Sequence, residues 1–156
     1  MATQTVNLRT DRPAKPLSNH PVFTHKATVK YDDINDSTFT TDGDLVEVQL
    51  LDTPDRFLMT NAMMDVKTAF ATDGTLTGQF GTDGDPNNFV ADTDVKTAGP
   101  IAPVAGANIL TVAGSSGTSS DVITLTFTTQ AATGAPADIT AGEVDVYFTL
   151  LDLAEL

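Results

Sequence analysis

The chain has 156 residues, which suits one domain with a two-layer core, and its lack of cysteine excludes disulfides and thiolate metal sites. Threonine occurs 26 times, whereas glutamate occurs three times and lysine and arginine together eight times, so strand formers outnumber helix formers. The net charge of −13 argues against nucleic acid or an anionic membrane as a partner, because both attract basic surfaces.

The charge is unevenly spread along the chain. Residues 1–30 carry five basic side chains and one acidic one, whereas residues 31–156 carry three basic and 20 acidic ones. Pro13, Pro16 and Pro21 also prevent a long helix near the N-terminus. The first segment is therefore expected to be extended and opposite in charge to the rest of the chain.

Two interpretations of this segment are open. A polar, proline-containing terminus is often disordered. Alternatively, residues 1–22 form an extended N-terminal arm on a β-sandwich domain of residues 23–156. The opposite charges favour the arm, which would dock on an acidic surface of a neighbouring subunit or another molecule through Arg9, Arg12 and Lys15.

Apolar and polar residues alternate over about eight segments, which predicts strands rather than helices. These segments are 23–31, 45–51, 56–60, 66–70, 76–80, 109–112, 122–129 and 142–153. Turn signals and polar loops separate them, along with a crossing rich in alanine, glycine and proline at 98–108. We therefore expect an all-β fold, an antiparallel β-sandwich of the jelly-roll or Greek-key type.

The clearest local unit is interpreted as a β-hairpin. Val66, Thr68 and Phe70 would share one face of its first strand, and Asp73-Gly74 has the chemistry of a tight turn. The alternation then resumes as far as Phe80. A helix over 56–71, or a helical turn over 59–65, is the alternative, since apolar residues there could also form a stripe.

The same alternation predicts which side chains form the core between two sheets. The predicted core residues are Val29, Val46, Val48, Val66, Phe70, Phe80, Ile123, Leu125, Phe127, Val144, Val146 and Phe148.

No group of residues has the spacing of a catalytic site. His20 and His25 lack a matched carboxylate or thiolate for zinc, and Gly114-Ser-Ser-Gly does not have the spacing of a nucleophile elbow. Neither a phosphate-binding loop nor a dinucleotide fingerprint occurs. The sequence therefore predicts a protein that is not an enzyme and that uses no cofactor.

One loop has part of the pattern of a calcium site. Asp83, Asp85, Asn87 and Asp94 approximate the spacing of calcium ligands in a binding loop. The usual glycine and the final glutamate are replaced, however, and no helix pattern flanks the loop. Asx-rich turns also form for purely conformational reasons, and this explanation is the one we favour.

Five segments resemble those of small β-rich virion proteins of tailed bacteriophages. They are Lys26–Asp33 (K-A-T-V-K-Y-D-D), Leu45–Leu51, Val66–Phe70 (V-K-T-A-F), Gly81–Phe89 and Thr140–Val144 (T-A-G-E-V). The resemblance extends over residues 24–151, but it does not include the crossing at 98–108.

The resemblance implies a structural role on the virion, as a capsid decoration or cement protein on the outer surface of the capsid. Its partner would be the major capsid protein, and the family is often homotrimeric. The family has no catalytic residues to transfer to this chain. The alternative is a tail-associated or fibre-associated β-module that binds the host. Such a module would more often expose aromatic residues, and this chain has no tryptophan and only two tyrosines.

Overall fold

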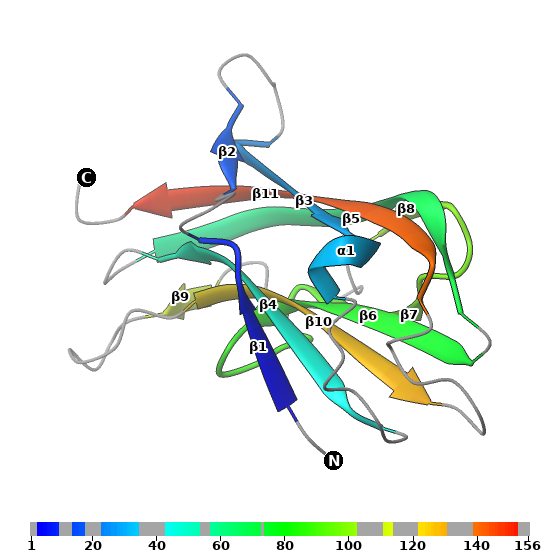
Figure 1. Ribbon diagram of the computed structural model, residues 1–156. Coiled ribbons are helices and arrows are strands. Elements are labelled where there is room, and N and C mark those ends of the chain that lie inside the picture. The colour runs from blue at the N-terminus through cyan, green and yellow to red at the C-terminus, as the bar shows by residue number, and fades with distance from the viewer. Residues whose placement is uncertain are drawn as a thin grey trace.

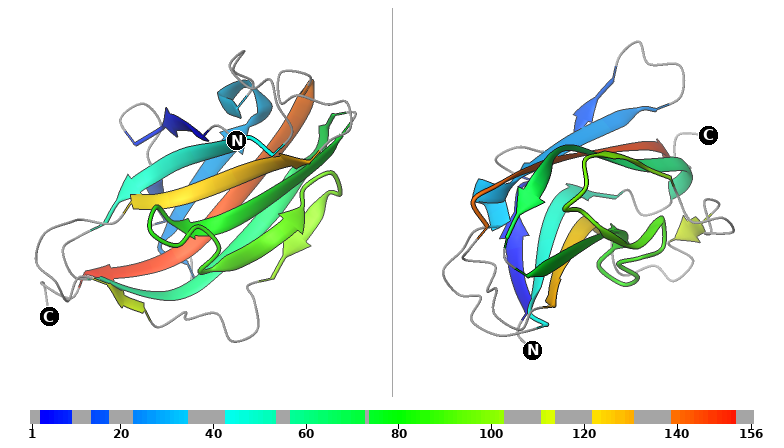
Figure 2. Two further views of the ribbon diagram at one scale, coloured as in Figure 1. Left: turned by 90° about the horizontal axis from the view of Figure 1, so that it is seen from below. Right: turned by 90° about the vertical axis from the view of Figure 1, so that its right-hand side faces the viewer.

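The computed structural model describes residues 3–9, 14–17, 23–34, 43–53, 57–72, 74–102, 111–113, 122–130 and 139–152. These residues form two β-sheets that lie face to face (Figure 1), and Figure 2 shows both layers from two other sides. The expected all-β sandwich is therefore confirmed.

One sheet, called sheet A, has the strand order β1-β4-β10-β6-β7. Its strands are β1 (Thr3–Asn7), β4 (Leu45–Asp52), β10 (Val122–Gln130), β6 (Thr75–Thr82) and β7 (Val90–Asp94). Only β1 and β4 are parallel, and the other described strand pairs of sheet A are antiparallel.

The other sheet, called sheet B, has the order β2-β3-β11-β5-β8, and β9 also pairs with β5. Its strands are β2 (Lys15–Pro16), β3 (His25–Lys30), β11 (Ala141–Asp152), β5 (Phe57–Ala71), β8 (Gly99–Ile101) and β9 (Thr111–Ala113). A single helical turn, α1 (Tyr31–Ile34), follows β3. No helix in the described part of the chain is long and apolar enough to cross a membrane.

Most consecutive strands pass from one sheet to the other, whereas β6 and β7 pair within sheet A. The strands β3 and β4 lie in different sheets, and so do β5 and β6, β7 and β8, and β10 and β11. The strand β10 lies between β4 and β6, while β11 lies between β3 and β5 (Figure 1). The C-terminal strands thus complete the middle of both sheets.

The prediction of a β-hairpin between Val66 and Phe80 is wrong. The strand β5 belongs to sheet B and β6 belongs to sheet A, so the two strands do not pair. Alternation indicates which face of a strand is buried, but it does not identify the neighbouring strand. Phe70 and Phe80 are both buried as predicted, and they reach the core from opposite sheets. Asp73 lies outside the described residues.

Two irregularities interrupt the alternation of β5. From Val66 to Ala71 this strand advances five residues while β11 advances three, from Val144 to Ala141. The additional residues are β-bulges, and they leave Thr68 exposed although it was expected to point inward. A second register shift in the pairing leaves Asn61 exposed. The helical alternative for this segment is wrong, because residues 57–71 form the strand β5.

All twelve predicted core side chains are buried. Aromatic rings connect the two layers: the centroids of Phe70 and Phe127 are 5.4 Å apart, and those of Phe80 and Phe148 are 5.7 Å apart. Further buried side chains that alternation did not predict join them. They include Leu8, Ala14, Ile34, Met59, Met64, Phe89 and Val95.

The described part of the N-terminal segment belongs to the sandwich. The strand β1 adds to the edge of sheet A and β2 adds to the edge of sheet B. The amides of Leu8 and Ala14 donate to the carbonyls of Gln49 and Leu50, at 3.0 and 3.2 Å. The side chains of Leu8 and Ala14 pack in the core of the domain. Residues 3–9 and 14–17 therefore do not form an arm separate from it.

Candidate functional site

One edge of the sandwich is basic. The described residues from β1 to β3 contain Arg9, Lys15, Lys26 and Lys30 and no acidic residue. The strands β1 and β2 are the end strands of their sheets, and β3 lies next to β2. These four side chains are called the basic edge below.

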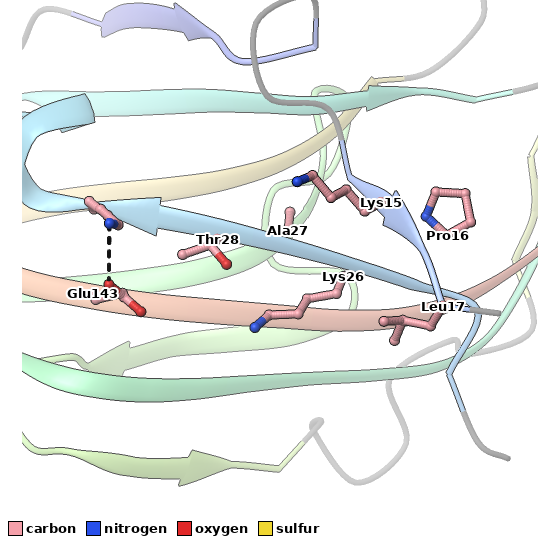
Figure 3. Close-up of a pocket in the computed structure, with 8 residues that line it drawn as sticks. Lys15, Pro16, Leu17, Lys26, Ala27, Thr28 and Glu143 are labelled. Atoms are coloured by element: carbon pink, nitrogen blue, oxygen red, sulfur yellow. Dashed lines mark ion pairs between the residues drawn. The ribbon is translucent and has the colours of Figure 1, made fainter. Parts of the chain in front are cut away.

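A groove of about 550 Å³ runs along the basic edge (Figure 3). Residues of β2 and the following Leu17 line one side, and residues of β3 with one residue of β11 line the other. The lining residues are Lys15, Pro16, Leu17, Lys26, Ala27, Thr28, Lys30 and Glu143. Three of the eight basic side chains of a strongly acidic protein therefore surround one groove.

Lys26 is held in place by a buried carboxylate. Its Nζ lies 2.8 Å from Oδ2 of Asp145, whose side chain is only 2% exposed. Thr28 Oγ1 donates to the same carboxylate at 2.6 Å, and the hydroxyl of Tyr147 donates at 3.2 Å. Lys26 Nζ also lies 5.5 Å from the centroid of the Tyr147 ring. The hydrogen bond with Asp145 raises the pKa of Lys26, so this lysine stays charged.

The other two lysines of the groove are less constrained. Lys30 Nζ lies 3.8 Å from a Glu143 carboxylate oxygen, a long contact between half-exposed side chains. Lys15 is exposed and forms no ion pair with any residue that the structure describes. Lys15 and Lys30 are therefore the basic groups of the groove that a partner could reach.

The strand β3 has an open edge beside the groove. The strand β2 pairs only with His25 and Lys26, the first two residues of β3. The amide of Leu17 donates to the Thr24 carbonyl at 2.8 Å, so the Thr24 carbonyl points toward β2. Every second residue of a strand directs its backbone groups to the same side, and Thr28 and Lys30 therefore also direct theirs toward the side of β2. The Lys30 amide donates instead to Asp33 Oδ2 at 2.7 Å. No described strand covers the edge at Thr28.

The opposite edge of the sandwich is acidic. Residues 81–95 contain Asp83, Asp85, Asp92 and Asp94 and no basic residue, and all four aspartates are exposed. This segment includes β7, the end strand of sheet A on the side away from β1. These four aspartates are called the acidic edge below.

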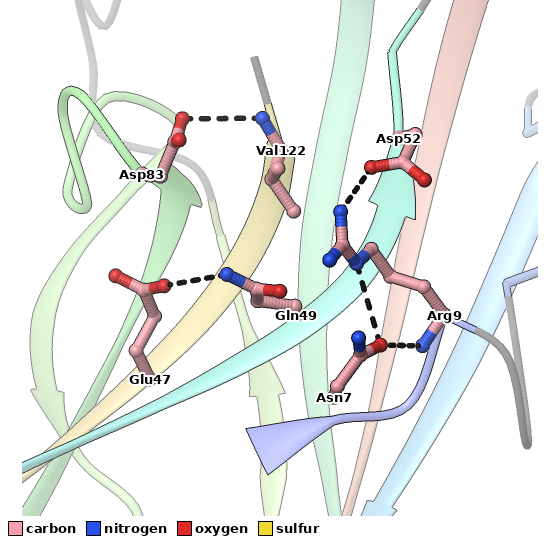
Figure 4. Close-up of polar contacts among 7 residues, drawn as sticks. All are labelled: Asn7, Arg9, Glu47, Gln49, Asp52, Asp83 and Val122. Carbon is pink, nitrogen blue, oxygen red and sulfur yellow. Dashed lines mark hydrogen bonds and ion pairs between the residues drawn. The ribbon is translucent and has the colours of Figure 1, made fainter. Parts of the chain in front are cut away.

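The loop at 83–94 does not gather its predicted calcium ligands. Asp83 accepts a hydrogen bond from the Val122 amide at 3.1 Å and so fixes the loop to β10 (Figure 4). Asp94 accepts from the amide of Lys96 and the hydroxyl of Thr97, while Asp85 and Asn87 are exposed. Among the residues that the structure describes, no three His, Asp or Glu side chains converge as metal ligands.

Loop conformation itself also explains part of this sequence. The Asp85 carbonyl accepts from the Thr82 amide at 3.0 Å. A Cβ at Gly81 would lie 2.6 Å from the carbonyl carbon of Pro86, so only glycine fits there.

Arg9 contacts its own domain. Its guanidinium forms an ion pair with Asp52 at the end of β4, and its amide donates to Asn7 Oδ1 at 3.0 Å (Figure 4). Of the three predicted attachment residues, Arg9 thus fastens the N-terminal segment to sheet A, and Lys15 lines the groove. Arg12 lies outside the described residues.

The outward face of sheet A is polar and carries little charge across β1, β4, β10 and β6, whereas Asp94 on β7 continues the row of Thr77. Three rows cross β1, β4, β10 and β6 on this face, and Glu47 is the one charged residue in them. The rows are Thr3-Leu45-Thr128-Thr77, Thr5-Glu47-Thr126-Gln79 and Asn7-Gln49-Thr124-Gly81. Gln49 donates to Glu47 across this face at 3.2 Å (Figure 4).

Two threonines in the middle of this face are buried, although the strand pattern predicted them to be exposed. Thr124 and Thr126 are at most 3% exposed, and their hydroxyls have no hydrogen-bond partner among the residues that the structure describes. Unpartnered buried hydroxyls carry a desolvation cost. This face is therefore closely packed as well as polar.

Sequence reasoning did not identify the groove. The alternation of Lys26, Thr28 and Lys30 did place these residues on one face of β3. The contribution of Lys15 depends on the pairing of β2 with β3, which no local pattern indicates. Asp145 was also missed, because a carboxylate on the outward face of a strand is normally exposed.

Comparison of the chain with protein-family models, with curated proteins and with solved structures gives no match.

Proposed function

We propose that the protein is a non-enzymatic structural protein of a tailed-bacteriophage virion, a capsid decoration or cement protein that binds the outer capsid surface. The observation that carries this proposal is the strand order. The strands β4-β10-β6-β7 pack on β3-β11-β5-β8, and successive strands of this set change sheets except β6 and β7, which pair in sheet A. We infer from this order a jelly roll, an arrangement used by viral capsid domains, lectins and cupins.

The sequence motifs select among these possibilities. The segments that resemble small virion proteins lie in β3, β4, β5, the β6–β7 loop and β11, which are elements of both sheets. The motifs thus extend through the whole sandwich rather than one hairpin. This distribution supports a relationship at the level of the domain, and it supports the virion role that the resemblance implies.

The outward face of sheet A is the surface that we propose for contact with the capsid. A protein with a net charge of −13 that binds a large surface gains from presenting a broad face with few carboxylates. Glu47 is the one carboxylate in the three central rows of that face. Threonine, asparagine and glutamine side chains there can form hydrogen bonds with the major capsid protein without charge repulsion.

The N-terminal segment has a different role in this proposal from that of a free arm. Its described residues complete the edges of both sheets, and Lys15 is left exposed beside a groove. We assign the basic edge to contacts between copies of the protein, in keeping with the homotrimer that the resemblance implies.

Labelling of virions tests the location. A specific antibody against the purified protein would be imaged by negative-stain electron microscopy on particles of the phage that carries the gene. The proposal predicts label distributed over the head. Label confined to the tail would instead support the tail-associated or fibre-associated host-binding module, and unlabelled particles would contradict a virion role.

A further inference from the structure

We propose that the basic edge of one copy binds the acidic edge of a second copy, so that the chain associates head to tail. The proposed structural role explains only why the copies would associate. The contact itself follows from the charges and the strand edges of the isolated chain, and it can be tested without a capsid.

The two edges are complementary in charge. The described residues from β1 to β3 carry four positive side chains and no negative one, and residues 81–95 carry four negative side chains and no positive one. Asp33, which follows β3, brings one carboxylate to the Lys30 amide at the basic edge. The end strands of the sheets place these groups on opposite sides of the sandwich. Within one molecule they are too far apart to pair, whereas two molecules placed side by side bring them together.

Both edges also offer exposed strand backbone. Among the strands that the structure describes, none covers β3 beyond Lys26, and β7 is the last strand of sheet A. Open strand edges favour pairing with another strand. The groove beside β3 (Figure 3) gives space for side chains of an incoming strand, and its lining includes Lys15 of β2 and Lys30 of β3.

Contacts inside the chain reduce the charge that remains for a partner. Lys26 is paired with Asp145, Arg9 with Asp52, and Lys30 approaches Glu143. Lys15 and Lys30 therefore contribute most. Exposed ion pairs are individually weak, and salt screens them over about 10 Å at 0.1 M. The association is expected to be weak at physiological salt and stronger at low salt.

Head-to-tail contacts have a consequence for assembly. The two surfaces of such a contact differ, so each molecule can bind one neighbour on either side. The assembly is a closed ring if the rotation between neighbours closes, and a filament otherwise. A homotrimer is one such ring. A two-fold dimer, in which identical surfaces meet, is not compatible with this proposal.

Paired charge reversals test the contact. The first variant, Lys15→Glu with Lys30→Glu, reverses the accessible part of the basic edge. The second, Asp85→Lys with Asp92→Lys, reverses the acidic edge and spares Asp83 and Asp94, whose carboxylates hold local backbone. Lys67→Glu is the control, because Lys67 is exposed on β5, an inner strand of sheet B that belongs to neither edge.

Sedimentation velocity at low salt measures the result. The wild type and the control should sediment as species heavier than the 16.4 kDa chain, with the heavier fraction falling as salt is added. Each double variant alone should associate at least about tenfold more weakly. An equimolar mixture of the two variants should regain association, because each retains one native edge and the reversed edges complement each other.

Three results would overturn the proposal. The first is a wild-type protein that stays monomeric at tens of micromolar and low salt. The second is a double variant that associates as well as the wild type. The third is an equimolar mixture that stays monomeric although both variants keep the melting temperature of the wild type. None of these results bears on capsid attachment. A failure here is therefore distinguishable from a failure of the proposed function.

Discussion

Gly142 at the start of β11 lies directly against the ring of Phe70 on β5. A Cβ at position 142 would lie 2.7 Å from Cε1 of that ring and closer still to two other ring atoms. The φ angle of Gly142 is +145°, in a region that other residues rarely adopt. The bulged pairing of β5 with β11 brings these two residues together.

Substitution of this glycine should therefore be costly. We expect Gly142→Ala to destabilise the fold by about 2–4 kcal/mol, because backbone strain adds to a clash in the core. Gly99→Ala is the matched control. Gly99 has a similar φ of +141°, but nothing lies within 4 Å of its Cβ position. Denaturant unfolding of both variants measures the difference, and equal losses would show that Phe70 moves aside without cost.

Phe127 and Phe148 test the core itself. Both rings are buried, and each packs against a ring of another strand. Truncation of either residue to alanine should lower the free energy of unfolding by about 3–5 kcal/mol. A denaturation midpoint that neither truncation changes would contradict the packing described here.

Lys26 and Asp145 test the polar network under the groove. Lys26→Met should cost about 1–3 kcal/mol, since the buried Asp145 carboxylate loses its cation, whereas Lys67→Met at the exposed pair with Asp65 should cost about 0.5 kcal/mol or less. The double variant Lys26→Met with Asp145→Leu should cost less than the sum of its single changes. If Lys26→Met costs no more than Lys67→Met, the network does not stabilise the fold.

The pH dependence of this pair has a definite sign. The pKa of Lys26 is raised in the folded state, so the stabilisation is fully present below the ordinary lysine pKa and is lost as the pH rises through the raised value. The difference between the wild type and Lys26→Met should therefore be constant from about pH 6 to pH 9. A difference that shrinks within this range would contradict the assignment.

Calcium should not stabilise the protein. The Asp83 and Asp94 carboxylates are hydrogen-bonded to local backbone rather than directed at a common point. After chelation, millimolar calcium should leave the melting temperature unchanged. A bound ion at a hundredfold excess over its Kd would instead add about 2.7 kcal/mol. A clear rise in melting temperature would restore the calcium hypothesis for this loop.

Alternation predicted the buried faces of the strands because one side of each sheet must leave water. It correctly placed Val48, Leu125 and Val146 in the core, for example. It did not predict the partner of β6, because Phe80 can reach the core from either sheet. It also failed at Thr68, since a bulge changes the side on which the following residues lie.

The groove could be predicted even less from the sequence. Leu8 and Ala14 are isolated apolar residues in a polar segment, and only their contacts with β4 show that this segment is part of the domain. The position of Lys15 opposite Lys26 then depends on that placement. No local sequence pattern indicates strand pairing over such a distance along the chain. The opposite net charges of residues 1–30 and 31–156, in contrast, can be counted directly from the sequence.

Binding to capsids that lack the protein tests the proposed function most directly. Wild-type protein would be compared with Thr5→Glu/Gln79→Glu, which adds two carboxylates to the outward face of sheet A, and with Thr68→Glu/Ala71→Glu, which adds two carboxylates to sheet B. Co-sedimentation with the capsids should be retained by the wild type and the sheet B control and lost by the sheet A variant. Failure of the wild-type protein to bind capsids at any salt concentration would contradict the decoration role.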